Sequence, residues 1–320
     1  MNLDLFIENI TNPALLFFLL GVIAVQLKSD LSIPQNSAKF ISLYLLFAIG
    51  FKGGKELSHS DFGSDVYGMV LLGIITALII PLYSFFLVRK KVGNENAAAI
   101  ASSYGSISAV TFITCVSFLE LHNIKYGGHM IAIMALMEAP AIIVGVFLLS
   151  LFSKQKNNKK DMLELLKHSL TNSSVLLLLG SLAIGYIASD EQAQGIAPFT
   201  TDIFKGFLVI FLLDMGITSG KKLKALYSYG AFPVTFGTII PLLNGAIVAI
   251  CSHVITDNPG DRLLISILAA GASYIAVPAA MKIAAPKANP GLYIPMALAI
   301  TFPFNITIGM PIYYQIISSL

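Results

Sequence analysis

The chain has 320 residues, of which 56% are apolar and 12% charged, and its mean hydropathy is +0.80. A soluble domain has about 45–50% apolar and about 25% charged residues, so this composition excludes a soluble enzyme, a large extramembrane domain and a disordered chain. The net charge of +3 is too small to indicate a nucleic-acid partner. Cys115 and Cys251 lie in apolar stretches, so the sequence offers neither a disulfide framework nor a metal-ligand pattern, and we expect no cofactor.

Ten apolar segments, separated by charged or turn-rich breaks, are predicted to be transmembrane helices. Their runs are continuously apolar, whereas barrel strands would alternate apolar and polar residues over about 10 positions. Residues 1–10 contain Asp4 and Glu8 but no Lys or Arg, so a cleavable signal peptide is not expected. In chain order, the segments cover residues 11–27, 40–51, 65–88, 97–119, 128–152, 171–188, 203–218, 229–254, 262–281 and 291–317.

The distribution of basic residues predicts the orientation in the membrane. Of the 20 Lys and Arg residues, 15 lie in loops that follow odd-numbered segments, and five lie on the other side. Because cytoplasmic loops are enriched in Lys and Arg, we expect a multi-pass protein of the cell inner membrane with both termini outside the cytoplasm. The five residues on the outer side are Lys52, Lys55, Lys125, Lys205 and Arg262.

The two halves of the chain resemble each other. Residues 49–57 align with 215–223, residues 12–30 align more weakly with 172–190, and Ser103-Tyr104 aligns with Ser273-Tyr274. Each half holds five segments, an odd number, so the second repeat must be inverted relative to the first, an arrangement found in many secondary transporters. We therefore predict a first five-helix repeat over 1–153, a cytoplasmic linker over 154–169 and a second repeat over 170–320. The basic linker is either a topology determinant or a docking site for a cytoplasmic regulator.

The fourth and ninth segments are each interrupted by polar or helix-breaking residues. The interruptions lie at corresponding positions of the two repeats, within residues 101–111 and 269–278. Gly105 lets the chain leave helical geometry, Ser108 can cap a new helix, and Pro278 suits a first helical turn. Two helix N-termini that face each other would form an anion site. The alternative is that the small residues only let helices pack closely. The predicted anion-binding residues are Gly105, Ser106, Ser108, Ala276 and Val277.

A cation site is predicted beside the anion site. The half-helices that precede the interruptions end in free carbonyl groups near Tyr104 and Ser273, which suit a small cation. Glu138 is an ionisable residue at membrane depth, which by itself suggests a function. Its carboxyl group could bind and release a proton instead of a sodium ion, so a proton-coupled carrier stays open as an alternative. The predicted sodium-binding residues are Tyr104, Thr111, Glu138, Ser273 and Asn305.

Several motifs make the chain resemble the sodium-dependent bicarbonate permease family over nearly its whole length. The most specific is the block from Pro286 to Ile294, with its Pro-x-Ala-Asn-Pro element. The others are Ile49-Gly50-Phe51-Lys52-Gly53-Gly54, Tyr104-Gly105-Ser106-Ile107-Ser108-Ala109-Val110-Thr111, Met137-Glu138-Ala139-Pro140 and Met215-Gly216.

The resemblance implies an all-α polytopic fold of ten helices in two inverted five-helix repeats, with broken helices 4 and 9. It further implies a homo-trimer, sodium coupling, bicarbonate as the substrate and a cytoplasmic PII-like regulator. Two positions depart from the family pattern: residues 271–276 contain one serine and no acid, and Glu138 replaces an aspartate. The sequence contains no metalloprotease, serine-hydrolase or P-loop motif, so an enzyme or ATP-driven pump is not expected. A non-transporting membrane sensor or scaffold stays open as an alternative to a secondary transporter.

Overall fold

The computed structural model describes residues 7, 9–59, 63–152 and 173–320, and the described residues form helices and connecting loops without a strand. The predicted linker over 154–169 lies outside them. In chain order, the elements are α2 (Pro13–Gln26), α3 (Gln35–Ser58), α4 (Ser64–Val92), α5 (Asn94–Gly105), α6 (Ala109–Leu121), α7 (His129–Phe152), α9 (Ser173–Ile187), α10 (Asp190–Ala197), η1 (Pro198–Asp202), α11 (Phe204–Leu223), η2 (Lys224–Tyr229), α12 (Phe232–Cys251), η3 (Ser252–Val254), α13 (Pro259–Ala270), α14 (Ala276–Ala284), α15 (Pro290–Pro295), η4 (Met296–Thr301), α16 (Phe302–Phe304), η5 (Asn305–Gly309) and α17 (Met310–Ser318).

Helices lie at all the apolar segments predicted from the sequence, and several are long enough to cross a bilayer. Six helical stretches among the described residues meet the length and hydropathy expected of a span, and α2 and α9 are shorter apolar helices. The chain is therefore a multi-pass membrane protein. The six stretches are α4, α5 with α6, α7, α10 through α11, α12, and α15 through α17.

Two predicted segments were too short. Helix α3 continues to Ser58, beyond the predicted end at residue 51, and α11 continues to Leu223. The additional part of α3 contains Gly53, Gly54 and Lys55, which resemble the end of a span in sequence. It remains helical because it packs closely on α9: a Cβ added to Gly54 would lie 2.0 Å from the Leu182 carbonyl oxygen. Tertiary packing here outweighs the weak helix propensity of glycine.

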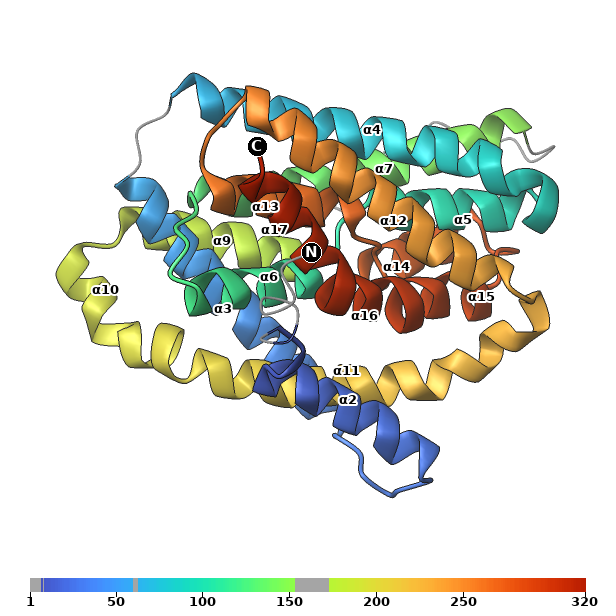
Figure 1. Ribbon diagram of the computed structural model, residues 1–320, viewed down its shortest axis with the longest axis horizontal. Helices are drawn as coiled ribbons and strands as arrows, with labels where there is room; N and C mark the ends of the chain where they lie inside the picture. Colours follow the sequence, from blue (N-terminus) through green and yellow to red (C-terminus); the bar gives the residue numbers. More distant parts are fainter. Residues whose placement is uncertain (1–6, 8, 60–62, 153–172) are drawn as a thin grey trace.

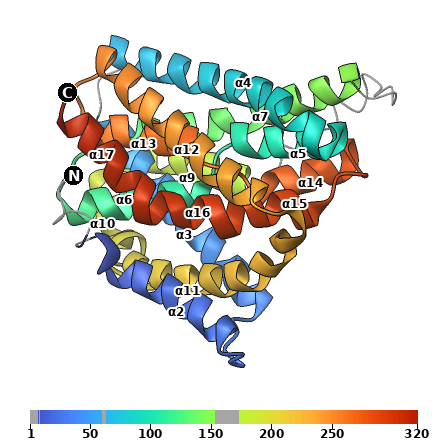
Figure 2. The same cartoon turned by 45° about the vertical axis from the view of Figure 1, so that its right-hand side comes forward.

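Helices α2, α3, α9 and α11 form a four-helix group in which small residues let backbones approach. Helix α3 packs on α9, where a Cβ on Gly50 would lie 2.9 Å from the Ser181 Cβ. Helix α2 packs on α11, where a Cβ on Gly216 would lie 3.1 Å from the Gly21 Cα. Figures 1 and 2 show α2 and α11 side by side at one edge of the molecule.

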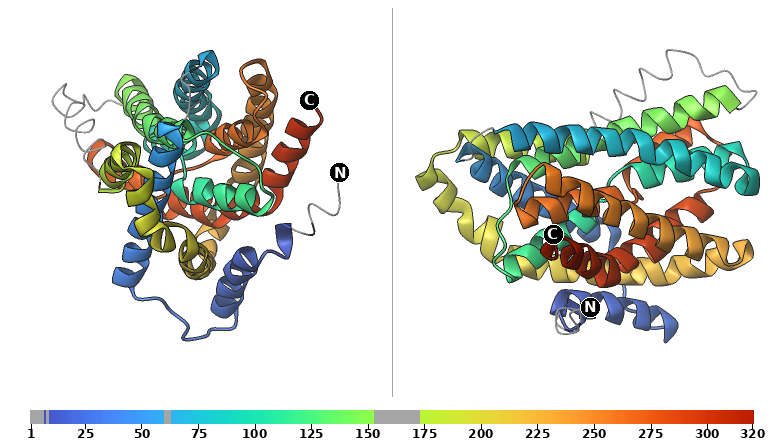
Figure 3. Two further views of the ribbon diagram at one scale, coloured as in Figure 1. Left: turned by 90° about the vertical axis from the view of Figure 1, so that its left-hand side faces the viewer. Right: turned by 45° about the horizontal axis from the view of Figure 1, so that its top comes forward.

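The remaining helices form a second group that contains both interrupted helices. Helix α4 packs against α5 and α7, and α12 packs against α13 and α17. In Figure 3, α4 and α7 lie at the edge of the molecule opposite to α2, with the interrupted helices between these edges. The interruptions thus lie inside the molecule, away from both of these edges.

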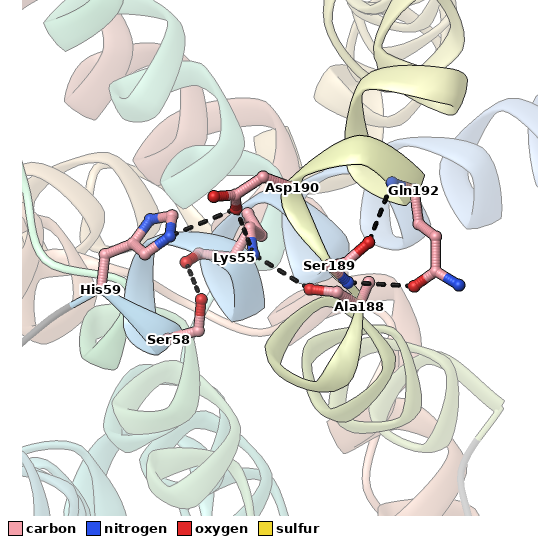
Figure 4. Close-up of polar contacts among 7 residues, drawn as sticks. All are labelled: Lys55, Ser58, His59, Ala188, Ser189, Asp190 and Gln192. Atoms are coloured by element: carbon pink, nitrogen blue, oxygen red, sulfur yellow. Dashed lines mark hydrogen bonds and ion pairs between the residues drawn. The ribbon is translucent and has the colours of Figure 1, made fainter.

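An ion-pair cluster ties the end of α3 to the start of α10 (Figure 4). The Lys55 Nζ lies 2.6 Å from Asp190 Oδ1 and donates to the Ala188 carbonyl oxygen at 2.9 Å, while His59 Nε2 lies 3.3 Å from Asp190 Oδ1. Polar α10 has no buried residue and lies outside the apolar part of its helical stretch. The hydrogen bond from Lys55 holds the pKa of the exposed Asp190 carboxyl below its ordinary value. Asp190 is therefore ionised near neutral pH.

Candidate functional site

The first interruption separates α5 from α6. Helix α5 ends at Gly105, Ser106 is extended, and α6 begins at Ala109 with Ser108 as its N-cap. The Ser108 Oγ accepts a hydrogen bond from the Thr111 backbone N–H at 3.2 Å and lies 2.8 Å from the Thr111 Oγ1. The predicted cap is therefore confirmed, and it satisfies one of the four N–H groups that a helix start leaves without an intrahelical partner.

The second interruption separates α13 from α14 and is built differently. Helix α13 ends at Ala270, Gly271 is extended, and α14 begins at Ala276 without a side-chain bond from its N-cap residue. The nearest substitute is a long contact of 3.5 Å from the Val277 N–H to the Ser273 Oγ. Pro278 lies in the first turn of α14, where a missing N–H costs no helical hydrogen bond, as the sequence predicted.

The two interruptions cross and are hydrogen-bonded to each other. The Ser273 N–H donates to the Ser103 carbonyl oxygen at 2.8 Å, and the Ser103 Oγ donates to the Ser273 carbonyl oxygen at 2.5 Å. A Cβ added to Gly271 would lie 3.1 Å from the Ser108 nitrogen, so the backbones of the two interruptions are also in contact at this point. Ser103 and Ser273 are the residues that the internal repeat aligned with each other.

A cavity of about 40 Å³ lies against this crossing. It has room for about three water molecules, at about 10–15 Å³ each, or for a small anion of a few heavy atoms. The first turn of α6 and the N-terminus of α14 both open onto it, so backbone N–H groups and the positive ends of two helix dipoles share the space. The lining residues are Ser42, Leu45, Leu46, Ile107, Ser108, Ala109, Val110, Ile113, Met134, Ala135, Glu138, Ser174, Val175, Leu178, Phe211, Ser273, Tyr274, Ile275 and Ala276.

Glu138 is the acidic residue of this cavity. It lies in α7, is 9% exposed, and no hydrogen bond or ion pair of its carboxyl group is found among the described residues. An ionised carboxylate without a partner is costly at this depth, so the group needs a proton or a bound cation. Its oxygen atoms are of the kind that hard cations prefer. The cavity thus combines donors for an anion with an acceptor for a cation.

Four predicted site residues line the cavity: Ser108, Glu138, Ser273 and Ala276. Three predicted anion-binding residues do not. A Cβ on Gly105 would lie 2.5 Å from the Pro81 Cδ, so this glycine permits packing against α4. The Ser106 Oγ donates to the Glu138 carbonyl oxygen at 3.4 Å, and Val277 is fully buried.

The predicted sodium ligands are not assembled as one set. Thr111 reaches the cavity only through Ser108. The Tyr104 hydroxyl lies 2.8 Å from the Thr301 Oγ1, and the Asn305 amide donates to the Ala270 carbonyl oxygen at 2.7 Å. The Asn305 amide therefore already bonds to the last carbonyl group of α13, which was expected to be free for a cation. Of the five predicted ligands, Glu138 and Ser273 line the cavity.

Comparison with known proteins identifies the family. The model of the Na+-dependent bicarbonate transporter superfamily matches residues 13–318. The chain belongs to this superfamily. A search of curated proteins finds no match to it. Membership of a transporter superfamily agrees with several apolar helices around a small cavity that is mainly apolar but contains Glu138 and the hydroxyl residues Ser108 and Ser273.

In this superfamily member, sequence reasoning missed the contribution of the four-helix group to the cavity. Ser42 of α3, Ser174 of α9 and Phe211 of α11 line it together with residues of the crossing. Tyr274 also lines it, and its hydroxyl donates to the Met215 Sδ at 3.8 Å. The alignment of Ser273-Tyr274 with Ser103-Tyr104 could have indicated Tyr274, whereas no local pattern marks the two serines.

Proposed function

We propose that this protein is a sodium-coupled symporter that takes up a small anion, with bicarbonate as the first candidate. The observation that supports this most strongly is the shared cavity, where two helix N-termini meet the buried carboxyl group of Glu138, which has no polar partner in the part of the chain that the structure describes. The helix ends, with Ser108 and Ala276, would hold the anion. Glu138, with Ser273, would hold sodium, whose charge would relieve the repulsion between the carboxylate and the anion.

The contacts of the structure support an inverted repeat of ten transmembrane helices as part of this proposal. The packing of α3 on α9 through Gly50 and Ser181 has its counterpart in the packing of α11 on α2 through Gly216 and Gly21. These residues correspond to each other in the sequence repeat. Two inverted repeats are related by a pseudo-twofold axis in the membrane plane. The reciprocal bonds of Ser103 and Ser273 lie where this axis would pass.

Alternating access would follow from movement between the two helix groups. The cavity takes part of its lining from α3, α9 and α11 and the rest from α7 and the two interrupted helices. A displacement of one group against the other would therefore open the cavity toward one side and close it toward the other. In the proposed orientation, in the inner membrane, both termini face outward and α10 lies on the outer side. The trimer and the PII-like regulator implied by the family stay predictions.

The orientation can be tested with single cysteines in a Cys251→Ala background, because Cys115 is buried. We expect Ala193→Cys in α10 to react with a membrane-impermeant thiol reagent added to intact cells, and Lys222→Cys at the end of α11 to react only after lysis. The reverse labelling pattern would overturn the orientation.

Uptake of labelled bicarbonate by proteoliposomes tests the function. An inward sodium gradient should drive uptake by the wild type, and Glu138→Gln should remove the sodium dependence while the protein still inserts. Glu191→Gln, at an exposed position of α10, is the matched control and should behave like the wild type. Uptake driven by a proton gradient alone would favour the second candidate, a proton-coupled anion carrier in which Glu138 titrates. Absence of uptake under both gradients would favour a sensor or scaffold.

A further inference from the structure

A second and larger space lies away from the cavity, and the proposed function does not use it. It is an open groove of about 630 Å³ between the ends of α3 and α6, the loop after α6, η1 and the start of α11. These segments lie toward the left of Figure 1. The groove is lined by Lys52, Glu120, Asn123, Ile124, Lys125, Thr201, Asp202 and Lys205.

The groove gathers basic residues on the side of the protein that has few. Only five of the 20 Lys and Arg residues belong to this side, and three of them line the groove. Lys52 forms an ion pair with Glu120, and Asp202 adds a second acid. Lys125 and Lys205 are exposed and make no ion pair among the described residues. The lining thus carries one more positive than negative charge, with two ammonium groups free to meet an anion.

The groove stands directly outward of the cavity. Helix α3 contributes Leu45 to the cavity and Lys52 to the groove, and α6 contributes Ile113 and Glu120 in the same way. Helix α11, which runs in the opposite direction, contributes Lys205 to the groove and Phe211 to the cavity. Six or seven helical residues correspond to about 10 Å of rise. Three helices therefore lead from the groove to the cavity over the same short distance.

We propose that this groove is an external collecting site for small inorganic oxyanions, which holds bicarbonate loosely before it enters the cavity. The inference rests on the proposed function for the identity of the anion and for the orientation. A groove with one sign of charge in excess raises the local concentration of counter-ions and their rate of arrival. Glu120 and Asp202 limit this attraction, and a site on a transport path must bind weakly enough to release its ion.

Transport kinetics provide the first test. The double variant Lys125→Gln/Lys205→Gln should raise the apparent KM for external bicarbonate by about three- to tenfold at low ionic strength and leave the maximal rate unchanged. The difference should shrink at high salt, because exposed charges are then screened. Lys282→Gln/Lys287→Gln removes two exposed lysines from the opposite side and should not change KM. An unchanged KM in the groove variant at low ionic strength would overturn the proposal.

A second test needs no transport. Thr201→Cys, in the Cys251→Ala background, places a thiol in the groove. An anionic thiol reagent should modify it faster than a cationic reagent of the same size, and bicarbonate should slow the anionic reaction. Lys125→Gln/Lys205→Gln should remove both effects. Equal rates for the two reagents would refute the collecting site. If the labelling rates are as expected but the protein shows no sodium-driven uptake, the proposed function is refuted and the groove is still an anion-collecting site.

Discussion

The two interrupted helices occupy corresponding places in the chain but are stabilised by different means. The first is closed by its own side chains, since Ser108 caps α6 and bonds to Thr111. The second has no side-chain bond from its N-cap residue and is held from outside, by two bonds to Ser103 of α5 and one from Asn305 to Ala270. The second interruption therefore depends for its position on Ser103 of the first interrupted helix and on Asn305.

This difference bears on how a ligand would be held. The first interruption brings the Ser108 hydroxyl group and backbone N–H groups to the cavity, whereas the second brings mainly backbone, the hydroxyl of Ser273 and Tyr274, whose own hydroxyl bonds to Met215. The loss of polar residues over 271–276 need not remove an anion site that is built from main-chain donors. Substitutions in the first interruption should therefore have larger effects than matched substitutions in the second.

The largest difference is expected at the glycines. A Cβ at Gly105 would lie 2.5 Å from the rigid Pro81 ring, so Gly105→Ala should lower the free energy of unfolding by about 1–3 kcal/mol. Gly271→Ala should cost less, because its nearest contacts are at 3.1 Å. Gly206→Ala in α11, which has open space around it, is the control and should be neutral or stabilising. Thermal unfolding of the purified proteins measures this order, and equal losses at Gly105 and Gly271 would contradict it.

The next largest effect is expected at Ser108, the N-cap of α6. Ser108→Ala should cost about 0.5–2 kcal/mol. If the whole cost falls on the anion-bound state, affinity should drop by up to about thirtyfold, at about 1.4 kcal/mol per factor of ten. The control is Ser150→Ala, which loses an exposed bond to the Phe147 carbonyl oxygen in the apolar helix α7. Equilibrium binding of bicarbonate to both variants separates a specific effect from general loss of packing.

A smaller difference is expected between the paired serines. Ser103→Ala removes a buried bond of 2.5 Å and should destabilise the protein by about 0.5–1.5 kcal/mol. Ser273→Ala removes only the long contact at 3.5 Å and should have a weaker effect, because hydrogen bonds weaken at that distance. The midpoints of thermal unfolding report the comparison. A greater loss for Ser273→Ala would show that the second interruption does not depend on the first.

The smallest effect is expected at Asp190, far from both interruptions. Because the pKa of its carboxyl is lowered, the contact with Lys55 stabilises the fold at and above the ordinary pKa and is lost as pH falls through the lowered value. Asp190→Asn should slightly lower the unfolding temperature at pH 7 and leave uptake unchanged. The difference from the wild type should vanish on acidification below the lowered pKa. A difference that persists there would assign the effect to packing.

The sequence was informative where local chemistry decides the structure. Both interruptions, the Ser108 cap and the burial of Glu138 could be predicted, because glycine, serine and an acid in an apolar segment have few structural explanations. The direction of side chains could not be predicted. Tyr104 bonds to Thr301, and Asn305 bonds to Ala270 at the end of another helix. Such contacts depend on how helices rotate against one another, which the composition of a segment does not reveal.

Equilibrium binding of labelled bicarbonate to the purified protein, measured over a range of sodium concentrations, tests the shared cavity most directly. If the two helix N-termini hold the anion and Glu138 holds sodium, the affinity of the wild type should rise with sodium concentration. Glu138→Gln should abolish that rise, and Ser108→Ala should weaken binding at every sodium concentration. Binding that is the same with and without sodium, and unchanged in Ser108→Ala, would contradict the account.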